Sequence, residues 1–505
     1  MKKQIKLGAI LSYVAIALSI VSGLVYTPWM IQEIGKSDYG LYTLANSIIN
    51  IFLVDFGLSA ATARFLSKYN AEGDREKANQ FMGVVYKLYL LIDAVVLVSL
   101  IAIYFVIDTG LFKLAPEEIP RFKVVYIVAS LYAVIHFPFV TQNGVLTSYE
   151  KIIQLKYADI LYRVLLIGGT VLALMQGWGL YSLVCANALA GLLVIVYKYI
   201  VISTHTPLKA NFRASGKGVY KSLFGFSVWT TVSSLAQRLI FGIIPSVLGI
   251  MCAESVATSE IAVFGIITTI EMYFYMVTSA INGIFMPKIA RIYAGSDEES
   301  DVLPLMTRVG KFQFFLNGLL VVGFAAAGQE FISLWLEPGY GAAYWGTLCV
   351  ILPGMFMNAL QIANTAMIVQ NKIRLRALID LGTGLLNVAL AFLLVGRYGA
   401  LGGGVSIGVA YSVRAILYHI VCVKVLKINI PRFAMNCYFR FVPTFGFTFA
   451  AGLGLNLLWT SASWGYLIAK AAILTIVFVS SAYAIALTKQ ERASVTSIAK
   501  RLIRR

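Results

Sequence analysis

Residues 81–107 read FMGVVYKLYLLIDAVVLVSLIAIYFVI, a stretch whose only charged side chains are Lys87 and Asp93. A helix needs about 20 mostly apolar residues to cross the hydrocarbon core of a bilayer. Within lipid, a helix pairs its backbone N–H and C=O groups inside its own segment, so one apolar stretch of this length predicts a transmembrane helix.

Similar stretches follow one another along almost the whole chain, with only short polar gaps between them. The chain is 59% hydrophobic and 13% charged, whereas about a quarter of the residues of a soluble domain are charged. We therefore predict an all-α polytopic membrane protein with about fourteen transmembrane helices. The expected spans lie near 8–34, 40–66, 81–107, 121–147, 157–176, 180–203, 222–250, 260–286, 311–335, 345–369, 378–396, 402–425, 441–459 and 465–487.

The gaps alternate between rich and poor in Lys and Arg. Of the 41 basic residues, 30 fall on the side that holds both termini, and five fall on the other side. The basic side of a membrane protein stays in the cytoplasm, so both termini are expected there. The net charge of +18 then reflects topology and attraction to anionic lipids. It does not indicate a nucleic-acid partner.

An internal repeat is the second informative feature. At an offset of 221 residues, Asn143 matches Asn364, Lys151 matches Lys372 and Asp159 matches Asp380. An even number of spans separates the copies, which predicts parallel repeats. We expect two pseudo-symmetric six-helix lobes, 1–210 and 211–430, followed by two further helices and a basic cytoplasmic tail over 431–505.

Two such lobes are expected to enclose a cleft, and interrupted helices at matching places in both halves mark a transporter's binding site. Pro28 and Pro245 occupy such places. They are candidates for helix breaks that line the cleft. The alternative is that each proline only bends or ends a helix near the membrane surface.

The sequence offers few signs of catalysis. The five cysteines are scattered without a CxxC pair, the three histidines lie far apart, and no Walker A run is present. We therefore expect no catalytic residues, no metal site and no cofactor.

Several short motifs carry a family resemblance. The run Leu24–Pro28, followed by Gly35–Tyr42, Asp55–Leu58 and Ala63-Arg64, resembles the oligosaccharide flippases of polysaccharide biosynthesis. These belong to the multidrug/oligosaccharidyl-lipid/polysaccharide (MOP) exporter superfamily. The resemblance implies a MATE-like fold in the bacterial cytoplasmic membrane. The resemblance also implies that the protein translocates undecaprenyl-diphosphate-linked repeat units by alternating access. These units would serve surface polysaccharides such as O-antigen or capsule, and other polysaccharide assembly proteins would be partners.

Basic residues inside the spans are the candidates for holding the diphosphate, because the guanidinium fork of Arg makes paired, charge-assisted bonds to phosphate. Arg238 is predicted to lie deep in span 7, and a charge at that depth indicates a functional site. Arg414 in span 12 and Arg64 at the end of span 2 are further candidates. The alternatives are a structural ion pair for Arg238 and Arg414, and a plain cytoplasmic anchor for Arg64.

Three carboxylates, Asp55, Asp93 and Glu271, fall near the middle of predicted spans. An unpaired carboxylate is costly to bury, so each must be paired, protonated or exposed to water. Pairing with Arg238 or Arg414 is the favoured interpretation, and coupling of transport to H⁺ or Na⁺ is the alternative.

Two other functions compete with the flippase. A cation-coupled multidrug exporter of the same superfamily shares the predicted fold. A membrane-embedded glycan polymerase or glycosyltransferase is less favoured, because the loops are short and lack a cluster of Asp or His.

Overall fold

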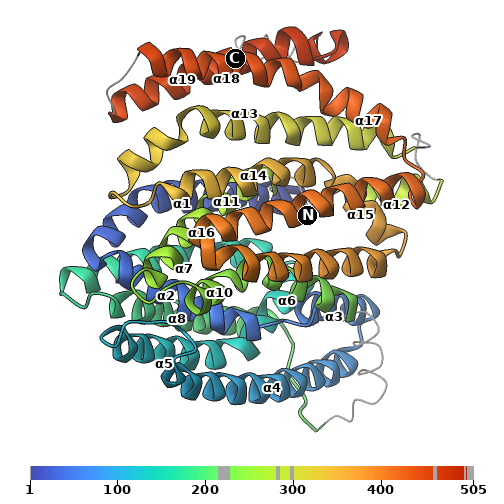
Figure 1. Cartoon of the computed structure of the whole chain (residues 1–505). Helices are drawn as coiled ribbons and strands as arrows, with labels where there is room; N and C mark the ends of the chain where they lie inside the picture. Colours follow the sequence, from blue (N-terminus) through green and yellow to red (C-terminus); the bar gives the residue numbers. More distant parts are fainter. Residues whose placement is uncertain are drawn as a thin grey trace. The chain divides into compact units, whose positions relative to one another are not determined.

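The computed structural model describes residues 2–213, 228–279, 285–295, 301–458, 463–493 and 496, with side chains described from residue 16 onward. Every regular element within these residues is helical (Figure 1). The chain divides into two compact units, which comprise residues 1–266 with 373–406, and residues 267–372 with 407–505.

The first unit holds the N-terminal helices. They are α1 (Lys2–Ile34), α2 (Lys36–Phe52), α3 (Leu58–Glu72), α4 (Arg75–Val106), η1 (Ile107–Thr109), α5 (Glu118–His136), η2 (Phe137–Val140), α6 (Thr141–Ser148), α7 (Ile152–Met175), α8 (Tyr181–His205), η3 (Arg238–Gly242), α10 (Ile244–Met251), and the first parts of α11 (Ala257–Ser279) and α16 (Ile373–Lys424).

The second unit holds the remaining parts of α11 and α16 together with the C-terminal helices. These are α12 (Met286–Tyr293), α13 (Leu303–Trp335), α14 (Ala342–Ala359), α15 (Gln361–Val369), α17 (Ile430–Cys437), η4 (Phe439–Phe441), α18 (Val442–Leu458), α19 (Trp464–Ser481) and η5 (Ala482–Ala486).

Among the described residues, ten helices are long and apolar enough to cross a membrane, and a bent pair, Val228–Gly242 with Ile244–Met251, makes eleven. α16 counts once although its 52 residues cover two predicted spans, which meet at the non-helical Gly399. α2, at 17 residues, is too short to be counted. The figure of about fourteen spans stays a prediction, and so do the lobe boundaries at 210 and 430.

The predicted repeat appears in the local backbone. Glu150 and Asn371, which are 221 positions apart, both adopt left-handed conformations, with φ of 56° and 57°. The next amides also match, since Lys151 N–H donates to Leu146 O at 2.8 Å and Lys372 N–H donates to Met367 O at 2.7 Å. The corner before α7 and the corner before α16 therefore have the same geometry at the offset that the sequence predicts.

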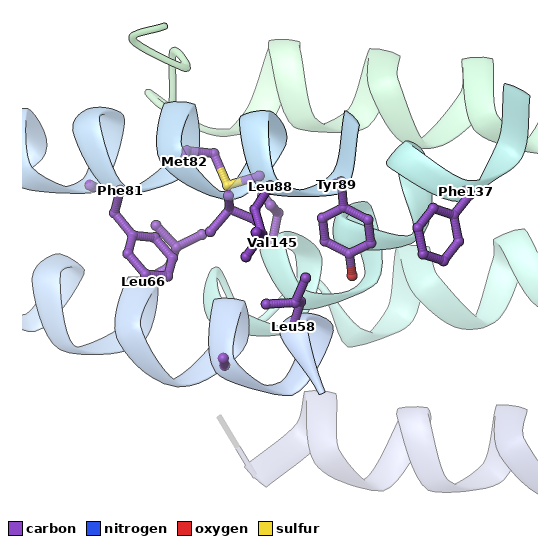
Figure 2. Packing of buried hydrophobic residues seen from close by; sticks show 11 residues of the cluster. Leu58, Leu66, Phe81, Met82, Leu88, Tyr89, Phe137 and Val145 are labelled. Atoms are coloured by element: carbon purple, nitrogen blue, oxygen red, sulfur yellow. The ribbon is translucent and has the colours of Figure 1, made fainter. Parts of the chain in front are cut away.

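A cluster of apolar side chains packs α3, α4 and α6 together in the first unit. Figure 2 shows Tyr89 of α4 beside Phe137 of η2, and their ring centroids lie 5.3 Å apart. In a bilayer, such packing stabilises by close contact, because lipid tails are as apolar as the side chains themselves. The cluster comprises Leu58, Ala61, Leu66, Ala78, Phe81, Met82, Val85, Leu88, Tyr89, Phe137 and Val145.

Gly144 allows α6 to approach α3 closely. A Cβ atom at this position would lie 2.5 Å from the carbonyl oxygen of Ser59 and 3.0 Å from Cβ of Thr62. Small residues permit this backbone approach between membrane helices.

We expect Gly144→Ala to lower the free energy of unfolding by about 1–3 kcal/mol, because the added methyl group meets backbone that cannot move aside. Thermal unfolding in detergent measures the change. Gly168→Ala is the matched control, since a Cβ there has nothing within 4 Å. Equal stability of the two variants would contradict the close-packing account.

Two buried cations join the C-terminal helices to α13 in the second unit. Lys470 of α19 is 2% exposed, and its ammonium lies 2.8 Å from Glu330 of α13. Lys311 of α13 lies 2.6 Å from Glu491, which follows η5. Leaving either cation without its partner would be costly, because a buried charge needs a counter-charge or hydrogen bonds.

The carboxyl group of Glu491 ties stability to pH. Burial raises its pKa, but hydrogen bonds from Lys311 and Thr488 outweigh burial and hold the pKa below its usual range. A carboxyl group with a lowered pKa stabilises the folded state at neutral pH, and this contribution disappears as pH falls from about 5 through the folded pKa.

We expect Glu491→Gln to remove this part of the acid sensitivity. The difference in melting temperature between wild type and variant should be largest at neutral pH and should shrink below pH of about 4. Glu254→Gln, at an exposed position, should follow the wild-type curve. A constant difference across the titration would show that Glu491 does not link folding to protons.

Candidate functional site

The second predicted span is broken in its middle. α2 ends at Phe52, α3 begins at Leu58, and the link contains Phe56 with φ of 51° and Gly57 with φ of 67°. Glycine adopts this left-handed conformation freely, whereas a residue such as Phe adopts it at a cost of roughly 1–2 kcal/mol. The break therefore falls on the Asp55-Phe56-Gly57-Leu58 motif.

Asp55 caps the start of α3 at this break. Its Oδ2 accepts a hydrogen bond from Ser59 N–H at 3.2 Å, and its Oδ1 accepts one from the hydroxyl group of Tyr89. Tyr89 also belongs to the apolar cluster of α3, α4 and α6. The core packing therefore fixes the orientation of a carboxylate within a predicted span.

The seventh predicted span bends by 42° between its two helical segments. Residues Arg238–Gly242 form a π-turn, and Ile243 N–H donates to Arg238 O at 3.0 Å. Pro245 stands three residues after the turn, as the second residue of α10. Because proline has no N–H and its ring crowds the carbonyl four residues earlier, it explains why the regular α-helix stops here.

Neighbouring helices satisfy the backbone around this bend. The side-chain amide of Asn387 in α16 donates to Leu239 O at 2.9 Å and to Ile240 O at 3.0 Å. The hydroxyl group of Ser47 in α2 donates to Gly242 O. Such side-chain donors allow a broken helix to exist at membrane depth.

Arg238 projects from the π-turn toward the break in the second span. Its Nη2 donates to Leu53 O at 3.3 Å, and that carbonyl group follows the last turn of α2. Within the described part of the chain, Arg238 makes no ion pair with a carboxylate. The guanidinium therefore keeps most of its five donors available.

Arg238 and Asp55 line one cavity of about 350 Å³, which lies entirely within the first unit. This volume is at the lower end of the range for ligand pockets, ~300–1,000 Å³. Eight of its fourteen lining residues are polar or charged, and two of these are joined by a hydrogen bond, which Tyr162 donates to Asn187 at 2.5 Å. The lining residues are Asn46, Ile49, Asn50, Leu53, Asp55, Ala129, Tyr132, Ala133, His136, Phe137, Val140, Tyr162, Asn187 and Arg238.

The sequence predictions missed most of the polar lining. Asn46 and Asn50 are four residues apart on α2, and Tyr132 and His136 are four apart on α5. Residues at this spacing share one helix face. Pairs of polar residues on one face of two apolar helices were the available signal for an inward-facing polar site.

The remaining candidate arginines lie elsewhere. Arg414 is 5% exposed in the second unit, and its guanidinium carbon lies 5.9 Å and 5.6 Å from the ring centroids of Tyr411 and Tyr418. Arg64 is exposed on α3. Neither residue lines the cavity that contains Arg238.

The three candidate carboxylates lie in different parts of the structure. Asp93 is 8% exposed in α4, and its Oδ1 has no hydrogen bond among the described residues. Glu271 is half-buried in the second-unit part of α11. Within the described ranges, Asp55 and Asp93 form no ion pair with Arg238, and Glu271 forms none with Arg414. Asp55 shares the 350 Å³ cavity with Arg238, whereas Asp93 and Glu271 are not among its lining residues.

Pro28 differs from Pro245 in its surroundings. It lies inside α1, and the helix continues past it to Ile34. The proposed role of the two prolines in lining a cleft stays a prediction.

Residues 7–293 match the family described as "Polysaccharide biosynthesis protein", which is more than half of the chain. The chain belongs to this family. It is also similar to the "Uncharacterized membrane protein EpsK" of Bacillus subtilis (strain 168). The two are 23% identical over 511 residues, which cover 95% of this chain and 94% of that protein.

Solved structures identify the fold. The lipid II flippase MurJ in an inward closed conformation aligns with a TM-score of 0.71 and 14% identity, over 94% of this chain and 98% of MurJ. An inward-facing multidrug resistance MATE family transporter of the MOP superfamily aligns with a TM-score of 0.64 and 14% identity, over 81% of this chain and 96% of the transporter. The chain is a multi-pass, all-α membrane protein with the MATE- and MurJ-like MOP fold, which confirms the predicted fold class.

We expect Asn387→Ala to destabilise the protein by about 1–3 kcal/mol, because two buried carbonyl groups of the bent span lose their donor. Thermal unfolding in detergent gives the size of the effect. Ser99→Ala is a suitable control, since Ser99 donates to Val95 O at an exposed site of α4. A variant of Asn387 as stable as the control would contradict the role of Asn387 at the bend.

Proposed function

We propose that this protein translocates undecaprenyl-diphosphate-linked oligosaccharide repeat units across the bacterial cytoplasmic membrane for surface polysaccharide synthesis, by alternating access. The observation that supports this most directly is Arg238, a guanidinium inside a predicted span that lines a polar cavity without an ion pair among the described residues. Membership of the polysaccharide biosynthesis family and a fold shared with a protein named as a lipid II flippase agree with it. We also propose that both termini lie in the cytoplasm.

The substrate explains why such a site is needed. A lipid-linked oligosaccharide combines a doubly charged diphosphate, hydrated sugars and a long apolar tail. Moving the polar part through hydrocarbon without compensating bonds is prohibitively costly. A polar pocket that offers charge-assisted hydrogen bonds from a guanidinium lowers that cost for the diphosphate, while the tail stays in lipid.

The cavity limits which part of the substrate it receives. At about 350 Å³ it suits a phosphate-sized group and leaves no room for an oligosaccharide. In this proposal Arg238 binds the diphosphate, and the sugars occupy a hydrated passage outside the cavity.

In this proposal Asp55 links the binding of phosphate to the binding of a proton. A phosphate bound to Arg238 would place a second anion in the cavity that Asp55 lines. Two anions so close repel each other, so phosphate binding would favour protonation of Asp55, and protonation would favour phosphate binding. In this proposal proton binding at Asp55 and phosphate binding at Arg238 are therefore linked, and coupling of transport to H⁺ or Na⁺ stays a proposal.

We expect Arg238→Ala to reduce translocation of an undecaprenyl-diphosphate-linked oligosaccharide in proteoliposomes by at least about tenfold, since a charge-assisted bond contributes roughly 1.5–3 kcal/mol. Arg238→Lys should retain part of the activity, because it keeps the charge but loses the fork.

The matched control is Arg397→Gln, which removes an exposed guanidinium at the end of a predicted span. Each variant should elute as a single species before it is assayed. Wild-type translocation by Arg238→Ala would refute the assigned role. Drug efflux by the wild-type protein, with no translocation of the lipid-linked sugar, would favour the multidrug exporter instead.

A further inference from the structure

A second cavity, of about 870 Å³, lies within the second unit at the start of α13. It is built where three elements meet, which are the first turns of α13, the α17–η4 segment before α18, and the residues after η5. Its lining residues are Asp301, Leu303, Pro304, Thr307, Arg308, Lys311, Phe312, Phe315, Arg432, Asn436, Phe441, Leu487, Thr488, Gln490 and Glu491.

The charges in this cavity are not balanced. Lys311 and Glu491 neutralise each other at 2.6 Å. Asp301 adds one negative charge and accepts a hydrogen bond from Leu303 N–H at the start of α13, so with the two arginines the lining has a net charge of +1. Arg308 and Arg432 are both exposed, and neither forms an ion pair with any residue that the structure describes. The cavity therefore presents two guanidinium groups that are free to bind an anion.

Much of the remaining lining is apolar. Leu303, Phe315, Phe441 and Leu487 contribute hydrocarbon surface beside the two guanidinium groups. Phe312 also lines the cavity and is 49% exposed. A ligand that fits this lining has a negatively charged head next to a hydrocarbon chain.

The residues around the cavity indicate that it lies at the level of the lipid headgroups. α17 is a short helix that buries Phe433 and leaves Arg432 and Met435 exposed, and Phe439 follows it at 60% exposure. Exposed apolar side chains next to arginine are typical of a segment that lies in the membrane interface. The predicted topology places this end of the spans in the cytoplasm, where the membrane surface carries anionic lipids.

We infer that this cavity binds an anionic phospholipid, with its phosphate on Arg308 and Arg432 and an acyl chain along Phe312 and Phe315. This site lies apart from Arg238 and goes beyond the proposed transport of lipid-linked sugars. Like charge disfavours the chain's own basic end, which includes Lys500, Arg501, Arg504 and Arg505, as the occupant. The apolar walls favour a lipid over free phosphate.

The test is lipid binding by the purified full-length protein in detergent, measured by native mass spectrometry and by the rise in melting temperature. Phosphatidylglycerol should bind saturably and raise the melting temperature, whereas phosphatidylcholine and inorganic phosphate should have little effect. The double variant Arg308→Gln/Arg432→Gln should weaken phosphatidylglycerol binding by at least about tenfold, because it removes two charge-assisted contacts. Each single variant should show a smaller loss, which keeps the test valid if the double variant folds poorly.

The charge-matched control is Lys424→Gln/Lys427→Gln, which removes two exposed positive charges from the same unit at positions outside the lining. It should bind phosphatidylglycerol as the wild type does. Wild-type binding by the Arg308/Arg432 double variant would overturn the proposal, as would equal effects of phosphatidylcholine. Protection by inorganic phosphate alone would overturn the assignment to a lipid. None of these measurements requires transport, so this proposal and the flippase proposal can fail separately.

Discussion

The need to satisfy every backbone hydrogen-bonding group within lipid governs this structure. Regular helices meet that need by themselves, and an interrupted helix meets it only with donors from its neighbours. The bend of the seventh predicted span depends on Asn387 and Ser47 for this reason. The break in the second span depends on Asp55, which caps α3, and on Arg238, which binds Leu53 O.

Both interruptions therefore contribute directly to the candidate site. The π-turn that Pro245 follows presents Arg238, and the left-handed link at Phe56 and Gly57 follows Asp55. A regular helix through the second span would leave the Leu53 carbonyl group without a free position for the guanidinium of Arg238. The polar cavity is thus a consequence of two irregular backbones that neighbouring side chains stabilise.

The apolar helices were predictable from the sequence, because each depends on one continuous apolar stretch. The matching corners at Glu150 and Asn371 were predictable from residues that recur 221 positions apart. The position of Arg238 inside a span was also predictable from the sequence, and its role in binding stays a prediction. The pairing of side chains between helices could not be predicted from the sequence. Asp55 was expected to pair with an arginine, yet its oxygens accept from Tyr89 and Ser59. Contacts between segments distant in sequence depend on helix rotation, which an apolar pattern alone leaves undetermined.

Tyr89 belongs to both the apolar cluster and the candidate site. Its ring packs among apolar neighbours that include Phe137, and its hydroxyl group donates to the carboxylate of Asp55. A substitution of Tyr89 would disturb both the packing of the apolar cluster and the orientation of Asp55. Asn187 and His136 line the cavity that contains Asp55 and Arg238, but they do not belong to the apolar cluster. A substitution at either position would change the lining of the cavity and leave the packing of Tyr89 in place.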